Sequence, residues 1–187
     1  MFPVEAAGEP KATISKESAM KKVAVYPGSF DPITNGHLDL IERGLKIFDS
    51  IVIAVAANPG KKPLFTFEER LEMINASIEG HPMQSRIQVG SFNGLLVDYV
   101  SSIKANTILR GLRAISDFEY EFQMALMNRK LSTEIETLYL MTGMRWIYIS
   151  SRIIKEVVMS GGCVTGLVSP AVEKRLAERL KEPNRSL

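Results

Sequence analysis

Short apolar runs alternate with longer stretches of helical periodicity from Lys22 almost to the end of this chain. Five of these runs predict strands, because strands of a parallel sheet are buried on both faces and read as continuous apolar segments. They span residues 23–26, 51–57, 86–89, 107–110 and 137–141. Strands that alternate with helical segments predict an α/β fold, built from strand-helix-strand units around a parallel sheet.

The segments between these strands carry apolar residues at helical spacing. The stripes are Leu38, Ile41, Leu45 and Phe48, then Leu71, Ile74 and Ile78, then Leu96, Val100 and Ile103. Two further helices are predicted at about 150–160 and at 169–181, the second with Ser169 as its cap and Pro170 in its first position. Because each stripe needs a buried partner, we expect a Rossmann-like, doubly wound sheet of five strands with helices on both faces.

Length and composition bear on the domain organisation. The chain has 187 residues, 45% of them hydrophobic, which favours one compact domain over several. Residues 1–19 differ from the rest, because charged residues, Gly8 and Pro10 interrupt every apolar run, whereas Met20 leads directly into the first strand. We expect residues 20–187 to form a single domain. We expect residues 1–19 to be an N-terminal extension, either flexible or added by an alternative start or by cloning.

Charge and cysteine content exclude several classes of protein. Lys and Arg (23) nearly balance Asp and Glu (21), which leaves a net charge of +2 and no basic stripe for a nucleic acid. No window approaches the roughly 20 apolar residues of a membrane span. The single cysteine, Cys163, excludes an intrachain disulfide, and two histidines give no basis for a dedicated zinc site. We therefore expect a cytoplasmic protein without nucleic-acid or membrane partners.

Residues 117–131 predict a helix with two apolar stripes instead of one. One stripe contains Phe118, Phe122, Ala125 and Leu126, and the other contains Tyr120, Met124, Met127 and Leu131. We expect one stripe to pack on the sheet, so that the other needs a second partner. That partner is equally well another element of the chain or a neighbouring subunit.

The loop after the first strand, residues 26–37 with the sequence YPGSFDPITNGH, combines the features of an anion site. Ligands of an open parallel sheet bind beyond the carboxyl ends of the strands, and the helix that this loop opens offers free amide groups. Gly28 allows a close approach of the backbone, Ser29 offers a hydroxyl, and His37 lies in the first helical turn. The loop matches neither the G-x-G-x-x-G nor the P-loop pattern. It predicts a phosphate site of another type; a solvent-exposed or capping role is the alternative for His37.

Several motifs carry a resemblance to a known family. GSFDP at 28–32 and TNGH at 34–37 resemble the T/H-x-G-H signature of the nucleotidyltransferase superfamily. The later motifs resemble those of the bacterial phosphopantetheine adenylyltransferases in order and spacing: NPGKKP at 58–63, RGLRA at 110–114, DFEYE at 117–121 and ISS at 149–151. The resemblance extends from Lys21 to about Leu180.

The resemblance implies transfer of an adenylyl group from ATP to 4′-phosphopantetheine, which gives dephospho-coenzyme A and pyrophosphate. The attacking group is a phosphate of the substrate, so that catalysis needs positioning and charge stabilisation but no covalent intermediate. The family also implies Mg²⁺ on the triphosphate without a dedicated protein metal site. A homohexamer and coenzyme A as a feedback ligand are further implications.

The resemblance also implies roles for individual residues. His37 is expected to hydrogen-bond the α-phosphate, while Lys61 and Arg110 hold the attacking phosphate, and these three are the predicted catalytic residues. Ser29 and Leu96 join Lys61 and Arg110 in the predicted substrate site. The predicted ATP site contains Ser29, Phe30, His37, Gly111, Leu112, Arg113, Glu121, Trp146, Ile147, Tyr148, Ile149, Ser150, Ser151 and Arg152.

Some of these residues have simpler interpretations. Leu96 fits a core leucine in a helical stripe, Lys61 fits a solvent-exposed loop lysine, and Ser150 fits a plain helix cap. Glu121 fits the polar edge of its helix. Arg152 departs from the family pattern, which usually has a third small hydroxyl residue at this position. Its guanidinium can grip the pyrophosphate in a bidentate fashion, or swing outward and leave the binding to the backbone. We therefore expect a changed affinity for ATP.

The sequence leaves alternative functions open. Another nucleotidyltransferase of the superfamily, acting on nicotinate mononucleotide or on a sugar or glycerol phosphate, shares the first two motifs. A nucleotide-binding module without catalysis is a second alternative, for which Arg152 is the only argument. The nucleotide-binding half of an aminoacyl-tRNA synthetase shares the signature too, but 187 residues leave no room for an anticodon-binding region.

Overall fold

A computed structural model describes residues 21–57, 63–113 and 115–181 of the chain. These residues form a five-stranded sheet with the strand order β3-β2-β1-β4-β5. The strands are β1 (Val23–Gly28), β2 (Ser50–Ala56), β3 (Ile87–Phe92), β4 (Thr107–Leu112) and β5 (Glu136–Met141). Every pairing is parallel, so the predicted α/β fold and its five strands are confirmed.

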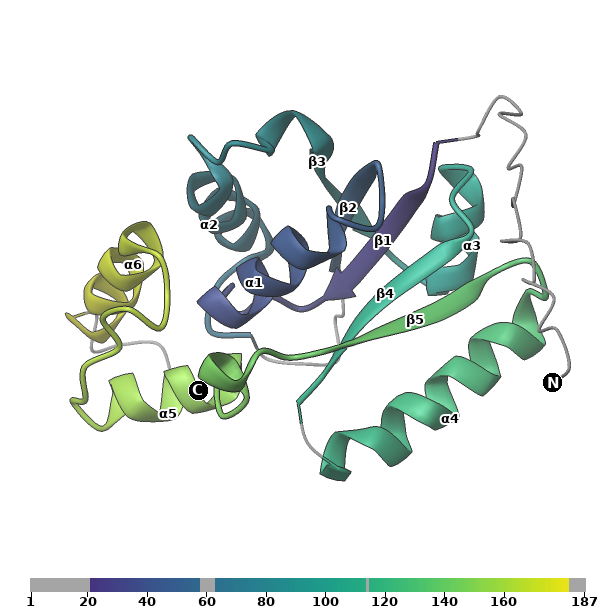
Figure 1. Ribbon diagram of the computed structural model, residues 1–187. Coiled ribbons are helices and arrows are strands. Elements are labelled where there is room, and N and C mark those ends of the chain that lie inside the picture. The colour runs from purple at the N-terminus through teal and green to yellow at the C-terminus, as the bar shows by residue number, and fades with distance from the viewer. Residues whose placement is uncertain (1–20, 58–62, 114, 182–187) are drawn as a thin grey trace, which may run out of the picture.

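Helices connect and follow the strands in the described part of the chain (Figure 1). They are α1 (Asn35–Gly44), α2 (Phe67–Ile78), α3 (Leu96–Ser102), α4 (Ile115–Leu131), α5 (Ser151–Met159) and α6 (Pro170–Lys181). The predicted helical segments correspond to them, although Leu45 and Phe48 lie beyond the end of α1 and Ile103 beyond the end of α3. Two short 3₁₀ helices, η1 (Gln84–Arg86) and η2 (Met144–Trp146), were not predicted, because three residues are less than one helical period.

The core has two parts because alternate residues of each strand face opposite sides of the sheet. Ala24 and Tyr26 belong to one buried cluster, which includes residues of four helices: Leu40 of α1, Ile74 of α2, Ile154 of α5 and Leu176 of α6. Val25, the residue between them, belongs to a second cluster with Val97 and Val100 of α3. Helices therefore cover both faces of the sheet, as the doubly wound arrangement requires.

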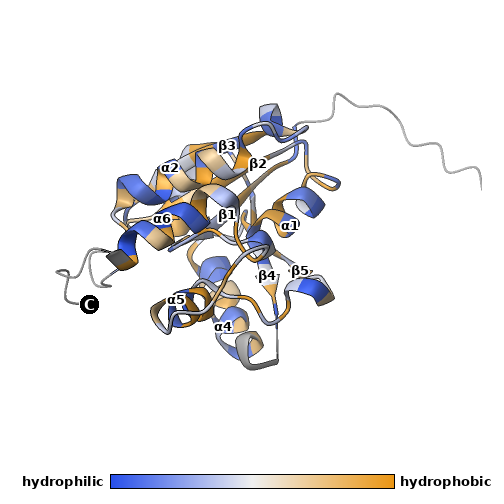
Figure 2. Ribbon diagram, turned by 90° about the vertical axis from the view of Figure 1, so that its left-hand side faces the viewer, coloured by the Kyte–Doolittle hydropathy of each residue, from blue (hydrophilic) through white to orange (hydrophobic). Residues whose placement is uncertain are grey.

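Helix α6 packs against α2, which lies beside it in Figure 1. Ser169 caps α6 as predicted, since its Oγ accepts a backbone hydrogen bond from the first turn at 3.4 Å and Pro170 is the first helical residue. Arg179 of α6 forms an ion pair with Glu69 of α2. Figure 2 shows both hydrophilic and hydrophobic residues on α6, as expected of a helix with one buried face.

Helix α4 lies beside β5 at the edge of the sheet and corrects one expectation (Figure 1). Apart from Ala125, the residues of both apolar stripes of α4 are exposed instead of packed on the sheet. Their exposed fractions run from 39% to 63% for seven side chains, which we call the α4 apolar surface: Phe118, Tyr120, Phe122, Met124, Leu126, Met127 and Leu131. The buried row contains Glu121 and Asn128, with the partly buried Ala125 between them. It faces inward because Glu121 pairs with Arg110 of β4.

None of the helices in the described ranges is both long and apolar enough to cross a bilayer. The expected N-terminal extension, residues 1–19, lies outside the described residues. The same holds for residues 58–62, which include Lys61, and for Ala114 of the RGLRA motif.

Candidate active site

A cleft of about 590 Å³ opens at the carboxyl ends of β1 and β4. Ligands bind at this edge of an open parallel sheet, and small-molecule sites have volumes of roughly 300–1,000 Å³. The β1–α1 loop, the strand ends, α4 and the start of α5 contribute its walls. The lining residues are Tyr26, Pro27, Gly28, Ser29, Phe30, Thr34, Gly36, His37, Leu40, Arg110, Gly111, Arg113, Tyr120, Glu121, Thr142, Trp146, Ile149, Ser150, Ser151 and Arg152.

A reciprocal cap holds His37 in the first turn of α1. The backbone N–H of His37 donates to Thr34 Oγ1 at 3.4 Å, and the backbone N–H of Thr34 donates to His37 Nδ1 at 3.0 Å. A backbone N–H only donates, so Nδ1 is the unprotonated acceptor and the ring proton lies on Nε2. His37 therefore has an Nε2–H donor to offer to a ligand in the cleft that it lines.

The surroundings of His37 keep its ring neutral. Burial lowers the pKa of His37, and the positive charges of Arg113 and Arg110 lower it further, to about 4. Protonation would also set an Nδ1–H against the Thr34 N–H, two donors face to face. At neutral pH the imidazole is thus a hydrogen-bond donor without a net charge.

Two partners fix Arg110, which lies in the second half of β4. Its Nε donates to Glu121 Oε2 at 2.8 Å, its Nη2 pairs with the other oxygen of that carboxylate, and its Nη1 donates to the Pro27 carbonyl at 2.9 Å. Burial by itself lowers the pKa of Arg110, but the hydrogen bonds and the charge of Glu121 outweigh burial and hold this pKa above its ordinary value. Arg110 is therefore a permanent cation in a fixed orientation beside the end of β1.

The start of α5 forms another wall of the cleft. Ser150 caps the helix, because its Oγ accepts the backbone N–H of Ile153 at 3.1 Å. The Ser151 hydroxyl donates to the Pro32 carbonyl at 2.8 Å. The first N–H groups of a helix have no intrahelical acceptor, so this turn offers amide donors to an anion. The side chain of Arg152 is 86% exposed and pairs with Glu156 at 2.8 Å, the outward of its two expected orientations.

Two glycines allow side chains to pack closely around the cleft. A Cβ on Gly28 would lie 2.9 Å from the ring of Phe30, and a Cβ on Gly111 would collide with Leu40. The ring of Phe30 in turn meets His37 edge to face, with centroids 5.2 Å apart. Gly28 therefore makes room for the Phe30 ring that contacts His37, and Gly111 makes room for Leu40 in the lining of the cleft.

Comparison with known proteins gives the family. The cytidylyltransferase-like family matches residues 25–157. The phosphopantetheine adenylyltransferase of Desulfosudis oleivorans is 55% identical over 159 residues, which cover 85% of this chain and 93% of that protein. The phosphopantetheine adenylyltransferase of Syntrophus aciditrophicus is 55% identical over 160 residues, covering 86% and 95%. The chain belongs to the phosphopantetheine adenylyltransferase family. The resemblance found in the sequence motifs is thereby confirmed.

A solved structure of low identity shows that the fold of this phosphopantetheine adenylyltransferase family member is shared more widely. Nicotinic acid mononucleotide adenylyltransferase from Plasmodium falciparum has a TM-score of 0.65 at 16% identity, over 85% of this chain and 96% of that one. At this identity the likeness concerns the fold alone, and it agrees with the Rossmann-like sheet described above.

The cleft of this family member brings together most of the residues predicted for the site. They are Ser29, Phe30, His37, Arg110, Gly111, Arg113, Glu121, Trp146, Ile149, Ser150, Ser151 and Arg152. Leu112, Ile147 and Tyr148 are outside the lining, and the last two are 45% and 63% exposed. Leu96 packs against the core cluster on the α3 side, which agrees with the simpler interpretation of that residue. Lys61 lies outside the described residues.

Four lining residues were given no role in the sequence analysis: Tyr26, Leu40, Tyr120 and Thr142. Tyr26 lies within an apolar strand and is typical of a core residue. Thr142 follows β5 and belongs to no motif. Tyr120 is different, because it lies next to Glu121 in the DFEYE motif, and that neighbourhood was a usable signal.

Proposed function

We propose that this chain transfers the adenylyl group of ATP to 4′-phosphopantetheine, forming dephospho-coenzyme A and pyrophosphate in coenzyme A biosynthesis. One observation carries the proposal: the neutral donor His37 and the cations Arg110 and Arg113 share one cleft, in a chain 55% identical to proteins named for this activity. Both substrates are anions, and a cleft of hydrogen-bond donors and cations suits them.

The proposed reaction requires no general base. A phosphate oxygen of 4′-phosphopantetheine attacks the α-phosphorus of ATP, the bond from this phosphorus to the α–β bridging oxygen breaks, and pyrophosphate leaves. The attacking oxygen already carries negative charge at neutral pH. We assign His37 Nε2–H to the α-phosphate oxygens, where charge rises in the transition state. Arg110 orients the attacking phosphate, a role that family resemblance extends to Lys61.

The other walls suit the nucleotide. The amide donors at the start of α5 are placed to receive the β- and γ-phosphates. The Ser150 hydroxyl accepts a backbone hydrogen bond and keeps its own proton to donate. The Ser151 hydroxyl is already donating to Pro32, so Ser151 would contribute through its backbone N–H. Gly111, Arg113 and Trp146 line the space left for the nucleoside.

We propose that Mg²⁺ accompanies the triphosphate. Across the described ranges, no three His, Cys, Asp or Glu side chains gather into a metal site. Glu121, which lines the cleft, is paired with Arg110. The cleft therefore suits a magnesium ion that is held by phosphate oxygens and water instead of protein carboxylates. When bound, the ion neutralises part of the charge on the departing pyrophosphate.

We further propose that the chain assembles as a homohexamer in the cytoplasm, with coenzyme A as a feedback ligand. The α4 apolar surface supports assembly, because seven large apolar side chains on one helix are exposed in the single chain. A free, exposed Cys163 suits a reducing compartment. Coenzyme A contains the pantetheine and adenylate groups of the product, so it would compete for the same cleft.

The test is a pyrophosphate-release assay with ATP, Mg²⁺ and three acceptors: 4′-phosphopantetheine, nicotinate mononucleotide and glycerol 3-phosphate. Of the three acceptors, we expect only 4′-phosphopantetheine to give pyrophosphate release. The product should have the mass of dephospho-coenzyme A. Release with another acceptor alone would assign a different nucleotidyltransferase activity. ATP binding without release from any acceptor would indicate a nucleotide-binding module.

A further inference from the structure

A buried carboxylate that the mechanism above does not use joins the β1–α1 loop to two other segments of the chain. Asp31, in the β1–α1 loop, is 5% exposed. Its Oδ1 accepts the backbone N–H of Phe65 at 3.0 Å. Its Oδ2 accepts the backbone N–H of Leu64 at 3.0 Å and the ammonium group of Lys155, on α5, at 2.5 Å. One side chain therefore ties the loop to the segment before α2 and to α5.

The same loop has further anchors on both sides of Asp31. Arg70 of α2, also 5% exposed, donates from Nη1 to the Ser29 carbonyl at 2.7 Å. Ser151 of α5 donates to the Pro32 carbonyl at 2.8 Å. Two contacts thus join the loop to α5, one from Ser151 in its first turn and one from Lys155 a turn later. Only the second is an ion pair with a buried partner.

We propose that Asp31 is a positioning residue for adenylyl transfer, and that its pair with Lys155 fixes the β1–α1 loop relative to the start of α5. This inference rests on the proposed function, in which these two walls hold different phosphates of one nucleotide. His37 would meet the α-phosphate, and the first turn of α5 would meet the β- and γ-phosphates. A displacement of about 1 Å between such groups lowers a rate by about 10²-fold. Each wall alone would still bind its phosphate.

The choice of variant follows from the burial of the pair. Removal of Asp31 would leave a lysine and two backbone amides without their acceptor, which destabilises the fold as well. The Lys155 side chain is 25% exposed, and without it Asp31 keeps both amide donors. Lys155→Met therefore removes the link to α5 with the smaller disturbance, and Lys155→Arg retains the charge.

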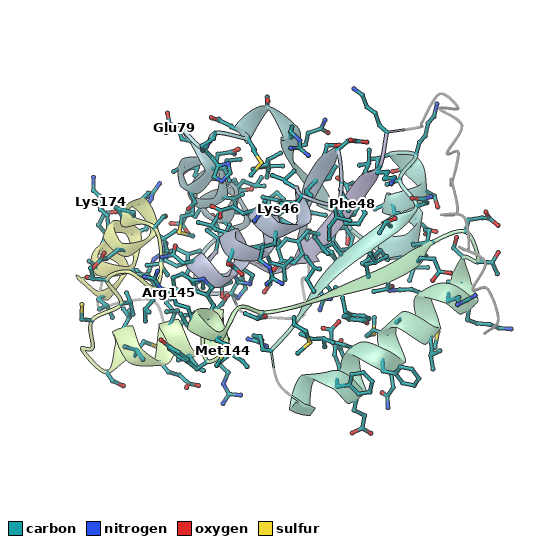
Figure 3. The ribbon with its side chains drawn as sticks, viewed as in Figure 1. Lys46, Phe48, Glu79, Met144, Arg145 and Lys174 are labelled. Carbon is teal, nitrogen blue, oxygen red and sulfur yellow. The ribbon has the colours of Figure 1, made fainter. Side chains whose placement is uncertain are left out.

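The experiment compares kcat, KM for ATP and unfolding temperature in these two variants. For Lys155→Met we expect kcat to fall about tenfold or more, a much smaller change in KM for ATP, and recovery of most of kcat in Lys155→Arg. Lys174→Met is the matched control, since Lys174 also pairs with a carboxylate, that of Glu178, but lies on α6 (Figure 3) and does not line the cleft. Unchanged kcat in folded Lys155→Met, or an equal loss in Lys174→Met, would overturn the proposal.

Two further measurements separate this inference from the proposed function. Amide hydrogen exchange across residues 28–34 reports the fixation of the loop without reference to activity, and we expect faster exchange in Lys155→Met. If the unaltered protein releases no pyrophosphate with any acceptor, the proposed function fails. Hydrogen exchange still tests the positioning role, because unchanged exchange in Lys155→Met rejects it. In the active protein, the double variant Asp31→Asn/Lys155→Met should lose no more kcat than the single variant with the larger loss, since the two residues act as one unit.

Discussion

At His37, a hydrogen bond from a backbone N–H fixes which nitrogen of the imidazole carries the proton. The third helical position of a reciprocal cap is usually occupied by Glu or Gln, whose side chain reaches back to the N-cap backbone. Here the Nδ1 of a histidine takes that role, accepting from Thr34. The same contact that closes the helix end therefore fixes the tautomer and leaves Nε2–H as the donor. One hydrogen bond therefore serves both the cap of α1 and the proposed catalysis.

The first prediction concerns the removal of this donor. In His37→Ala we expect kcat to fall on the order of 10²-fold or more, with a smaller effect on ATP affinity, because the contact strengthens as charge develops. Steady-state kinetics and calorimetric titration with a non-hydrolysable ATP analogue would measure the two effects. His37→Gln is the structural control, since glutamine can accept from Thr34 in the same cap. Equal losses in affinity and turnover would contradict the transition-state role.

The second prediction concerns pH. An unfolded histidine has a pKa near 6.5, whereas His37 in the fold has a pKa lowered to about 4 by burial and by Arg113 and Arg110. Between these values the unfolded chain binds more protons. The contribution of His37 to the free energy of unfolding is therefore complete above pH 6.5 and is lost as the pH falls toward 4.

An NMR titration checks this sign directly. The chain has two histidines, so a His81→Gln variant leaves the His37 Cε1–H as the single imidazole signal of its kind. We expect its midpoint near pH 4. A midpoint near 6.5 would show that neither burial nor the two arginines control the ring.

At the scale of elements, strands were easier to predict than α4. Every residue of 51–55 is buried, so the sequence has no polar position there to obscure the strand. Helix α4 shows two apolar stripes, and periodicity alone assigns one of them to the sheet. The structure turns inward the row with Glu121 instead, because Arg110, in a different element, binds that carboxylate. No spacing within α4 could reveal a partner on β4.

The candidate site shows the same limit. Residues within contiguous motifs, such as Ser29 and His37, could be predicted because their chemistry and their place at a strand end are both visible in the chain. The contacts of Asp31 could not, since its partners lie 33, 34 and 124 positions away. Thr142 was missed for a related reason: it enters the cleft only because β5 pairs with β4.

The third prediction concerns the first turn of α5. Arg152 pairs with Glu156, but water and salt screen an exposed pair of this type, so that it is weaker than a charge-assisted contact to a triphosphate. ATP can therefore draw the guanidinium from Glu156. In Arg152→Ser we expect the KM for ATP to rise about three- to tenfold with little change in kcat. Glu156→Gln, which frees Arg152, should leave this KM equal or lower. An unchanged KM in Arg152→Ser would discard a special role for this arginine.

At the scale of the whole molecule, assembly and the cleft meet in α4. Its outward side chains form the α4 apolar surface. Its inward Glu121 holds Arg110, and Tyr120 belongs both to the apolar surface and to the lining of the cleft. A second copy of the chain packed on this surface would therefore also restrain a wall of the site.

The fourth prediction tests that link through Met127, which is 55% exposed on α4. In Met127→Glu a charge replaces an apolar contact, and its desolvation opposes association. Light scattering after gel filtration should show six copies of the 20.8 kDa chain for the unaltered protein and a smaller species for the variant. Ile47→Glu, which changes an exposed apolar residue next to α1, should keep the larger mass. If Met127→Glu has the mass of the unaltered protein, or that protein is itself a monomer, the α4 apolar surface is not the subunit contact. A smaller species with reduced kcat would show that packing on α4 supports the cleft as well as the assembly.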